Sequence, residues 1–255
     1  DLDTLQLKRS INGVYYIYLF HSMGSTHMVD HANSYDAYDS LFCVGPHHVQ
    51  ELRKREELAG LQSRHLFEYG HPRLEQLILD GKSRPAEPSD PPRILVAPTW
   101  GENSIFNQCG KELVGILLEA GYGVIMRPHY QTRRLTPEVL DEVIDAWGDH
   151  ANFEVIEQMG ESDSLFRSHA LVSDWSGISI EYALGLEKPV LLVDLPRRVR
   201  NPDWRKLGIE PFEATIREQV GAVLPADALG QAPAALKRLL RLVRDQAAPK
   251  ATFTP

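Results

Sequence analysis

Residues that suit phosphate chemistry gather in one turn, the segment 173–177 with the sequence Ser-Asp-Trp-Ser-Gly. A short apolar run precedes this turn and a helix-length segment, 178–186, follows it. Such a strand, turn and helix place the hydroxyls of Ser173 and Ser176 and several backbone N–H groups at a helix N-terminus, where anions bind. Glu181, inside the helix, is placed to reach a ribose hydroxyl. The same residue types also serve as ordinary caps and tight turns, so the turn alone predicts phosphate binding and capping equally well.

Similar residues follow other predicted strands. Strands are predicted at 13–20, 93–97, 124–126 and 190–193, and a polar turn follows each of them. Parallel strands end on one edge of a sheet, and open α/β sheets bind ligands there. A set of His, Arg, Ser and Gly residues with few carboxylates predicts an anionic, phosphate-bearing ligand. The residues beyond these strands are His21, Thr99, Arg127, His129, Arg198 and Arg200.

Two histidines are candidates for a general base. An unperturbed imidazole has a pKa of about 6.5, which suits removal of a proton from a hydroxyl by His21 or His27. The alternative role for His21 is structural, as a histidine hydrogen-bonded at a strand end. With His31, three histidines fall within one short segment. His27 and His31 are spaced four apart and Asp30 lies near, but the three histidines lack the i, i+4 pair with its acid that marks metalloprotease helices, so we expect no metal site.

The segment 82–92 separates two regions in which strands and helices alternate. It holds four prolines and no apolar side chain larger than alanine, which is typical of a linker. We therefore expect one α/β domain over 1–81 and a second over 93–255. In the first domain, a buried strand is expected over 13–20, and a charged surface helix begins near residue 47. Further strands are expected over 40–44, 65–69 and 153–156, and the last two helices over 213–223 and 233–243.

The composition is that of an ordinary globular protein, with 43% hydrophobic and 24% charged residues among 255. A net charge of −8 argues against a nucleic-acid-binding surface. Cys43 and Cys109 lie far apart in apolar or helical surroundings, which indicates buried thiols in a reducing compartment. No apolar run is long enough to span a membrane, and no signal peptide is recognised. The chain starts without methionine and soon enters a strand, so we expect it to be part of a longer protein.

Five segments resemble, in the same order, motifs of the CDP-glycerol glycerophosphotransferase family, the teichoic-acid and capsule-type polyol-phosphate transferases. His21 after its strand resembles the family's His-Gly loop, and Arg127-Pro128-His129 resembles its second histidine motif. The turn 174–177, with Lys188-Pro189-Val190, resembles an Asp-Tyr-Ser-Ser helix followed by Lys-Pro-Val. The other two segments are Gly70-His71-Pro72-Arg73-Leu74 and the strand with its Pro-Thr-Trp turn over 94–100. The resemblance covers roughly residues 15–201.

The resemblance implies a GT-B architecture, in which two Rossmann-like parallel-sheet domains face a cleft. The first domain would be incomplete in this chain, because such a domain needs more than about a hundred residues. An acceptor hydroxyl would attack the phosphate next to the polyol of a CDP-activated donor, and CMP would leave. Glycerol phosphate, or a related polyol phosphate, would thereby pass to a glycan or polyol-phosphate acceptor in the synthesis of a cell-surface polymer. No tightly bound cofactor or metal is implied.

By the same resemblance, His21 would be the base and His129 would stabilise the pyrophosphate. Because Ser-Met-Gly follows His21 where the family has Gly, His27 remains an alternative base. Ser176 and Gly177 would hold a phosphate, and an arginine of the loop after 190–193 would neutralise charge on the leaving group. The residues expected to hold the donor are Thr99, Arg127, Ser173, Asp174, Ser176, Gly177, Glu181, Arg198 and Arg200.

Two other functions remain open. Ser176-Gly177 also resembles UDP-sugar epimerases of the same architecture, in which Glu181 would contact the ribose, so a UDP-sugar epimerase or glycosyltransferase is the alternative enzyme. The short first half favours a non-catalytic nucleotide-binding domain of a larger polymer-synthesis protein. We expect a cytoplasmic protein and leave open its peripheral association with the inner face of the membrane.

Overall fold

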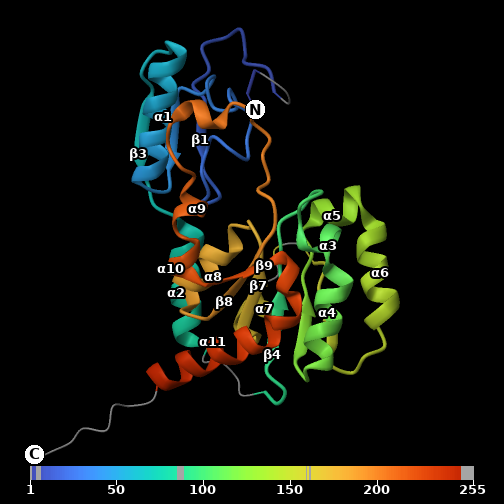
Figure 1. The fold of residues 1–255 in the computed structure, drawn as a ribbon. Helices are drawn as coiled ribbons and strands as arrows, with labels where there is room; N and C mark the ends of the chain where they lie inside the picture. Colours follow the sequence, from blue (N-terminus) through green and yellow to red (C-terminus); the bar gives the residue numbers. More distant parts are fainter. Residues whose placement is uncertain (1, 4–6, 85–88, 159, 161, 248–255) are drawn as a thin grey trace, which may run out of the picture. The chain divides into compact units, whose positions relative to one another are not determined.

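The computed structural model describes residues 2–3, 7–84, 89–158, 160 and 162–247. The chain folds into two compact units, each built on a parallel sheet (Figure 1). Unit 1 comprises Asp1–Gln76 and Arg198–Ile216, and unit 2 comprises Leu77–Arg197 and Arg217–Pro255. This division differs from the one predicted at 82–92, because helix α2 (Pro72–Ser83) already carries the chain into unit 2 and a later segment returns to unit 1. Residues 85–88 of the predicted linker lie outside the described residues.

Unit 1 is organised around three parallel strands in the order β1 (Ile17–Leu19), β2 (Ser40–Cys43) and β3 (His65–Glu68). Helix α1 (Pro46–Ala59) connects β2 with β3, since a parallel pair needs a crossover connection. The returning segment adds the 3₁₀ helix η1 (Trp204–Leu207) and the short helix α9 (Phe212–Thr215). The predicted strands at 40–44 and 65–69 are thus confirmed.

The first strand is shorter and more exposed than its sequence suggests. Tyr18 shares a face of the sheet with its cross-strand partners Leu41 and Leu66, and this face packs into the apolar core of unit 1. Ile17 and Leu19 point to the other face and are 48% and 56% exposed. The prediction of a buried strand over 13–20 is therefore wrong, because β1 has three residues and packs only one side chain into the core.

Unit 2 contains six parallel strands in the order β6-β5-β4-β7-β8-β9. The strands at 93–97, 124–126, 153–156 and 190–193 are confirmed, but the helix predicted over 213–223 is wrong. That stretch holds most of α9, the short helix α10 (Arg217–Val220) and the start of β9, in which exposed Val223 and buried Leu224 alternate with the period of a strand. The strands are β4 (Arg93–Val96), β5 (Gly123–Met126), β6 (Phe153–Val155), β7 (Ala170–Ser173), β8 (Val190–Asp194) and β9 (Ala222–Pro225).

Helices cover both faces of the six-stranded sheet, which explains why its strands are apolar almost throughout. Ile94 and Val96 pack on the face covered by α4, α6 and α11, whereas Leu95 between them packs on the face covered by α2, α7 and α8 (Figure 1). The remaining helical elements are α3 (Ile105–Gln108), α4 (Gly110–Glu119), α5 (Tyr130–Leu135), α6 (Pro137–Trp147), α7 (Asp163–Arg167), α8 (Ile178–Leu186), η2 (Ala226–Gln231) and α11 (Ala232–Ala247).

The strand order reverses between β4 and β7. From β4 the chain adds β5 and β6 on one side, and from β7 it adds β8 and β9 on the other. Because β4 and β7 are paired neighbours, the loops that follow them leave the sheet side by side at its carboxyl edge. Open α/β sheets bind ligands at such a switch point.

The two cysteines form no disulfide, and the helices of the described residues bear on membrane spanning. Cys43 and Cys109 are free thiols, and burial raises the pKa of each to about 11. Within the described part of the chain, no helix is long and apolar enough to cross a membrane.

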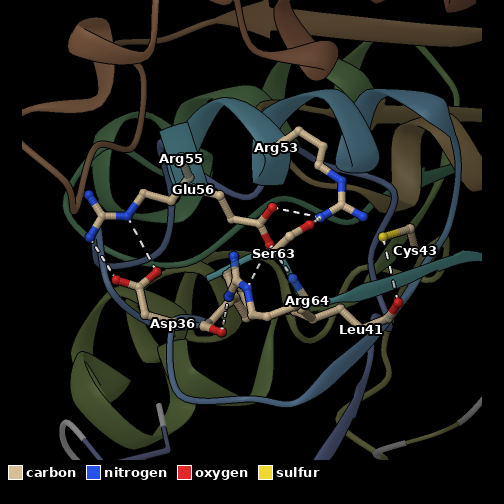
Figure 2. Close-up of polar contacts among 9 residues, drawn as sticks. Asp36, Leu41, Cys43, Arg53, Arg55, Glu56, Ser63 and Arg64 are labelled. Carbon is tan, nitrogen blue, oxygen red and sulfur yellow. Dashed lines mark hydrogen bonds and ion pairs between the residues drawn. The ribbon is translucent and has the colours of Figure 1, made fainter. Parts of the chain in front are cut away.

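Helix α1 buries polar residues that its sequence predicts to be solvated. His48, Glu51 and Glu56 all lie inside unit 1. Figure 2 shows the Glu56 carboxylate between two arginines: Oε2 accepts a hydrogen bond from Arg53 (2.6 Å), and Oε1 accepts from the backbone and the side chain of Arg64 (3.1 and 2.9 Å). Arg64 is itself buried and directly precedes β3. Glu56 therefore fixes α1 to the start of the next strand.

We expect the substitution Glu56→Gln to lower the free energy of unfolding by about 3–5 kcal/mol, because it leaves the charge of Arg64 buried without its partner. Its neighbour Glu57, which is exposed and pairs with exposed Lys54, provides the matched control. Glu57→Gln should change the same quantity by only about 0–1 kcal/mol. Urea titration of the three proteins measures both values, and equal effects of the two substitutions would contradict the buried-pair assignment.

Candidate functional site

A buried carboxylate joins the two loops at the switch point of unit 2. Asp174 follows β7 and is 1% exposed. Its Oδ1 accepts a hydrogen bond from the backbone N–H of Thr99 (2.7 Å), and its Oδ2 accepts one from the N–H of Ile105 (3.0 Å). Burial raises the pKa of Asp174 to about 6 even though these hydrogen bonds favour the charged form. Asp174 thus ties the loop after β4 to the turn after β7.

Two predicted ligand contacts turn out to serve this connection. Ser173 is completely buried, and its hydroxyl donates to the carbonyl oxygen of Ala97 (2.8 Å). Thr99 is also buried, with its N–H directed to Asp174. Ser173 therefore holds β7 to β4, which is a structural reason for its position and disagrees with the prediction of a phosphate contact by its side chain.

The half-buried turn that leads into α8 has the donors that an anion needs. Among the described residues, none accepts a hydrogen bond from the backbone N–H groups of Ser176, Gly177 or Ile178. The next N–H groups are occupied, since Ser179 donates to the carbonyl of Ser176 (3.1 Å) and Ile180 donates to that of Gly177 (3.1 Å). The first three groups match the cradle that the sequence predicts. Glu181 is buried in the first turn of the same helix.

Arg217 packs against the turn 174–177, and no sequence pattern indicated this contact. The residue is 7% exposed, and its guanidinium lies 3.9 Å from the centre of the Trp175 ring. It donates to the carbonyl oxygen of Asp174 (3.2 Å) and to the carboxylate of Asp194 (3.3 Å). Arg217 comes from α10, which lies within the incorrectly predicted helix 213–223, so no local motif pointed to the turn.

His129 lies beyond β5, and its ring is oriented by a cap. It forms the N-cap of α5, and its Nδ1 accepts a hydrogen bond from the N–H of Gln131 (3.1 Å). An accepting Nδ1 is unprotonated, so the neutral ring carries its proton on Nε2. The ring stacks with Trp100, which follows β4, at 6.0 Å between centroids. Arg127 is half-buried directly after β5, and its N–H donates to the carbonyl oxygen of Val96.

In unit 1, the two candidate bases have different surroundings. His21 is exposed just beyond β1. His27 is 7% exposed, with Nε2 3.1 Å from the carbonyl oxygen of Ile209 and Nδ1 3.3 Å from Oε2 of Glu51. One ring nitrogen faces a carbonyl oxygen and the other faces a carboxylate, an arrangement that favours the imidazolium form. A base must offer an unprotonated nitrogen, and this argument favours His21 over His27.

The pKa values of the pair agree with this assignment. Burial lowers the pKa of His27, but the hydrogen bond and charge of Glu51 outweigh it, and the pKa lies above the usual value of 6.5. Burial raises the pKa of Glu51, but hydrogen bonds from His27 and from the backbone and hydroxyl of Thr26 (both 2.7 Å) bring it below 4.5. The pair fixes the loop after His21 to α1.

The returning segment holds the same loop from another side. Glu213 accepts a hydrogen bond from the N–H of Ser25 (2.7 Å), and Asn201 donates to the carbonyl oxygen of His27 (2.8 Å). Arg198 and Arg200, predicted to contact the donor beside the turn, belong to this segment of unit 1. Exposed Arg200 lies 3.0 Å from Nε2 of His31. In the described part of the chain, no group of three or more His, Cys, Asp or Glu side chains is placed to hold a metal ion.

We expect His27→Gln to lower the free energy of unfolding by about 1–3 kcal/mol in mildly acidic solution, because it removes a buried charged partner of Glu51. The stabilisation by His27 is complete below pH 6.5 and is lost as the pH rises through its raised pKa, whereas that by Glu51 is lost as the pH falls from 4.5 through its lowered pKa. The difference between variant and wild type should therefore be largest between pH 4.5 and 6.5.

Chemical denaturation across this range and up to about pH 9 measures the profile. His65→Gln, at an exposed position of β3, is the control and should show little change at any pH. A His27 effect that does not decline at alkaline pH would contradict the imidazolium assignment.

Comparison with known proteins places the fold among GT-B enzymes. No protein-family profile and no curated protein sequence matches the chain. The solved structure of the wall teichoic acid polymerase TagF aligns with 95% of this chain and 64% of its own, at 15% identity and a TM-score of 0.51. The UDP-GlcNAc 2-epimerase of Methanocaldococcus jannaschii, in complex with UDP-GlcNAc and UDP, aligns with 82% of this chain and 61% of its own (14% identity, TM-score 0.49). MnaA of S. aureus with UDP aligns with 80% and 52% (18% identity, TM-score 0.48).

This chain thus spans between about half and just under two thirds of the length of these proteins. At these identities, the similarity is evidence of fold alone. The chain is an α/β protein with two parallel sheets, of three and six strands, and its fold is similar to that of GT-B enzymes.

Proposed function

We propose that this chain transfers a glycerol-phosphate or related polyol-phosphate unit from a CDP-activated donor to a hydroxyl of a glycan or polyol-phosphate acceptor, with release of CMP. The observation that carries the proposal is the turn at the switch point of unit 2, where the N–H groups of Ser176, Gly177 and Ile178 lack acceptors among the described residues. The five segments that resemble the CDP-glycerol glycerophosphotransferase family support the substrate class, and the similarity to a wall teichoic acid polymerase supports the fold. The reaction would need no tightly bound cofactor or metal.

The donor's phosphates fit the groups at this edge because those groups donate hydrogen bonds. The turn offers three backbone N–H groups and the hydroxyl of Ser176 at the N-terminus of α8. His129 adds an N–H on Nε2, since its Nδ1 is occupied by the cap. The loop after β4 connects these groups, because Trp100 stacks with His129 while Thr99 is bonded to Asp174.

In the proposed reaction, the acceptor oxygen forms a bond to the phosphorus next to the polyol. The bond from that phosphorus to the oxygen of the CMP phosphate breaks, and CMP leaves with the electron pair. His21 takes the proton of the acceptor hydroxyl, because it is exposed and is not fixed between two acceptors as His27 is. The N–H donors of the turn and of His129 stabilise the negative charge that develops on the leaving phosphate.

Calorimetric titration with CMP, CDP, CDP-glycerol and UDP tests the donor site. We expect cytidine-selective binding that weakens by about 10-fold in both Ser176→Ala and His129→Ala, which corresponds to the loss of one hydrogen bond to a charged group. His150→Ala is the matched control, because the Nδ1 of His150 accepts from the N–H of Asn152 (3.2 Å) just as that of His129 accepts from Gln131, but His150 precedes β6 at the opposite edge of the sheet. This control should bind like the wild type.

The measurement separates the proposal from its alternatives. A preference for UDP over CMP and CDP would indicate a UDP-sugar epimerase or glycosyltransferase instead. Nucleotide binding without CMP release in the full-length protein would indicate a non-catalytic domain. If CMP release proceeds unchanged in His21→Ala, the proposed role of His21 is wrong.

A further inference from the structure

Two arginines lie on the ring of Trp175, in the turn proposed to hold phosphate. The guanidinium carbon of Arg217 is 3.9 Å from the ring centre, and that of Arg197 is 5.3 Å away. Both distances fall within the range of a cation–π contact, about 6 Å. The ring itself is fixed, because its Nε1 donates to the carbonyl oxygen of Leu195 (2.7 Å), just beyond β8. Trp175 therefore positions two guanidinium groups beside the N-terminus of α8.

The two arginines have different surroundings. Arg217 is buried and donates to the carbonyl of Asp174 and the carboxylate of Asp194, so its donors serve the backbone of the turn. Arg197 is half-buried, and solvent reaches its side chain. Its carbonyl oxygen accepts a hydrogen bond from Nδ2 of Asn103 (3.3 Å), in the loop after β4. Arg197 is therefore held at the switch point by its backbone and by Trp175.

The charged groups around the turn 174–177 explain why a second cation, Arg197, would strengthen phosphate binding there. The carboxylate of Asp194 faces Arg217 (3.3 Å), and that of Asp174 is enclosed and hydrogen-bonded to the N–H groups of Thr99 and Ile105. These carboxylates offset the positive charge of Arg217. The N–H groups of the turn supply only partial charges. A full positive charge beside these N–H groups strengthens the binding of a diphosphate, and a guanidinium can hold two of its oxygens at once.

We propose that Arg197 binds the diphosphate of the nucleotide ligand, with Trp175 as the support that holds its guanidinium in place. The inference rests on the proposed function for the identity of the ligand, a nucleoside diphosphate. The expected donor contacts of Arg198 and Arg200, which belong to the segment of unit 1, stay predictions beside this inference. The stacked guanidinium loses little freedom on binding, which strengthens the interaction.

Titration of the chain with CDP, CMP and inorganic pyrophosphate tests the assignment. Arg197→Gln should weaken CDP and pyrophosphate binding about 10- to 100-fold and CMP binding less, because CMP lacks the second phosphate. Arg197→Lys should recover only part of this loss, since it restores the charge without the paired donors. Trp175→Leu should also weaken CDP binding. The matched control Arg238→Gln, at an exposed position of α11, should bind all three probes like the wild type.

Thermal unfolding separates binding from folding. Arg197→Gln should unfold close to the wild-type temperature because the side chain is half-buried, whereas Arg217→Gln should unfold earlier because it leaves a buried network incomplete. Unchanged CDP affinity in a folded Arg197→Gln variant would overturn the inference. Wild-type binding of pyrophosphate but of no nucleotide would overturn the proposed function, while loss of that pyrophosphate binding in Arg197→Gln would still support the role of Arg197. Absence of wild-type binding to every probe would overturn both.

Discussion

The carboxylate of Asp174 is the constraint on which the carboxyl edge of unit 2 depends. An ionised group at 1% exposure is very costly unless donors surround it, and Asp174 obtains two of its donors from the loop after β4. Movement of that loop would leave a buried charge without partners. The loop after β4 and the turn after β7 are therefore expected to move as one piece, and the N–H groups of Ser176 and Gly177 keep fixed positions for the proposed phosphate. A preorganised site of this kind avoids the cost of ordering its groups when the ligand binds.

Unit 1 uses a buried charge in a related way. The imidazolium of His27 and the carboxylate of Glu51 hold the loop that follows His21 against helix α1. Hydrogen bonds from Ser25 to Glu213 and from Asn201 to His27 add the returning segment to the same arrangement. In each unit, the candidate groups that solvent reaches lie on a loop that buried charged residues hold in place. The chemistry is thus assigned to groups that solvent reaches, and the buried residues determine where those groups lie.

The sequence predicted the alternation of strands and helices in both units because apolar runs and turn residues are local signals. It also located the turn at 174–177, because the spacing of a strand, a polar turn and a helix is visible in a short window. The structural roles of Ser173 and Asp174 could not be predicted, since they depend on contacts with the neighbouring strand β4 and the loop after it, which lie far away in the chain. The burial of Glu51 and Glu56 in a charged helix was hidden for the same reason: their partners His27 and Arg64 are not part of the helix.

The division into units shows most clearly what local patterns miss. A proline-rich segment at 82–92 looks like a boundary, but no local pattern indicates that the chain leaves unit 2 after Arg197 and returns at Arg217. The helix predicted over 213–223 crosses this second point, which is why both Arg217 and the edge strand β9 were missed. Arg198 and Arg200 follow β8 closely in the sequence but belong to the segment of unit 1, and their contacts with the donor stay predictions.

The ring of Trp175 contacts the residues on either side of the segment that returns to unit 1. Arg197 is the last residue of unit 2 before the segment Arg198–Ile216, Arg217 is the first after it, and both guanidiniums lie over the same ring. A cation–π contact contributes about 0.5–2 kcal/mol. Bringing the ends of a flexible loop together costs entropy that rises only slowly with its length, so two such contacts offset a useful part of that cost.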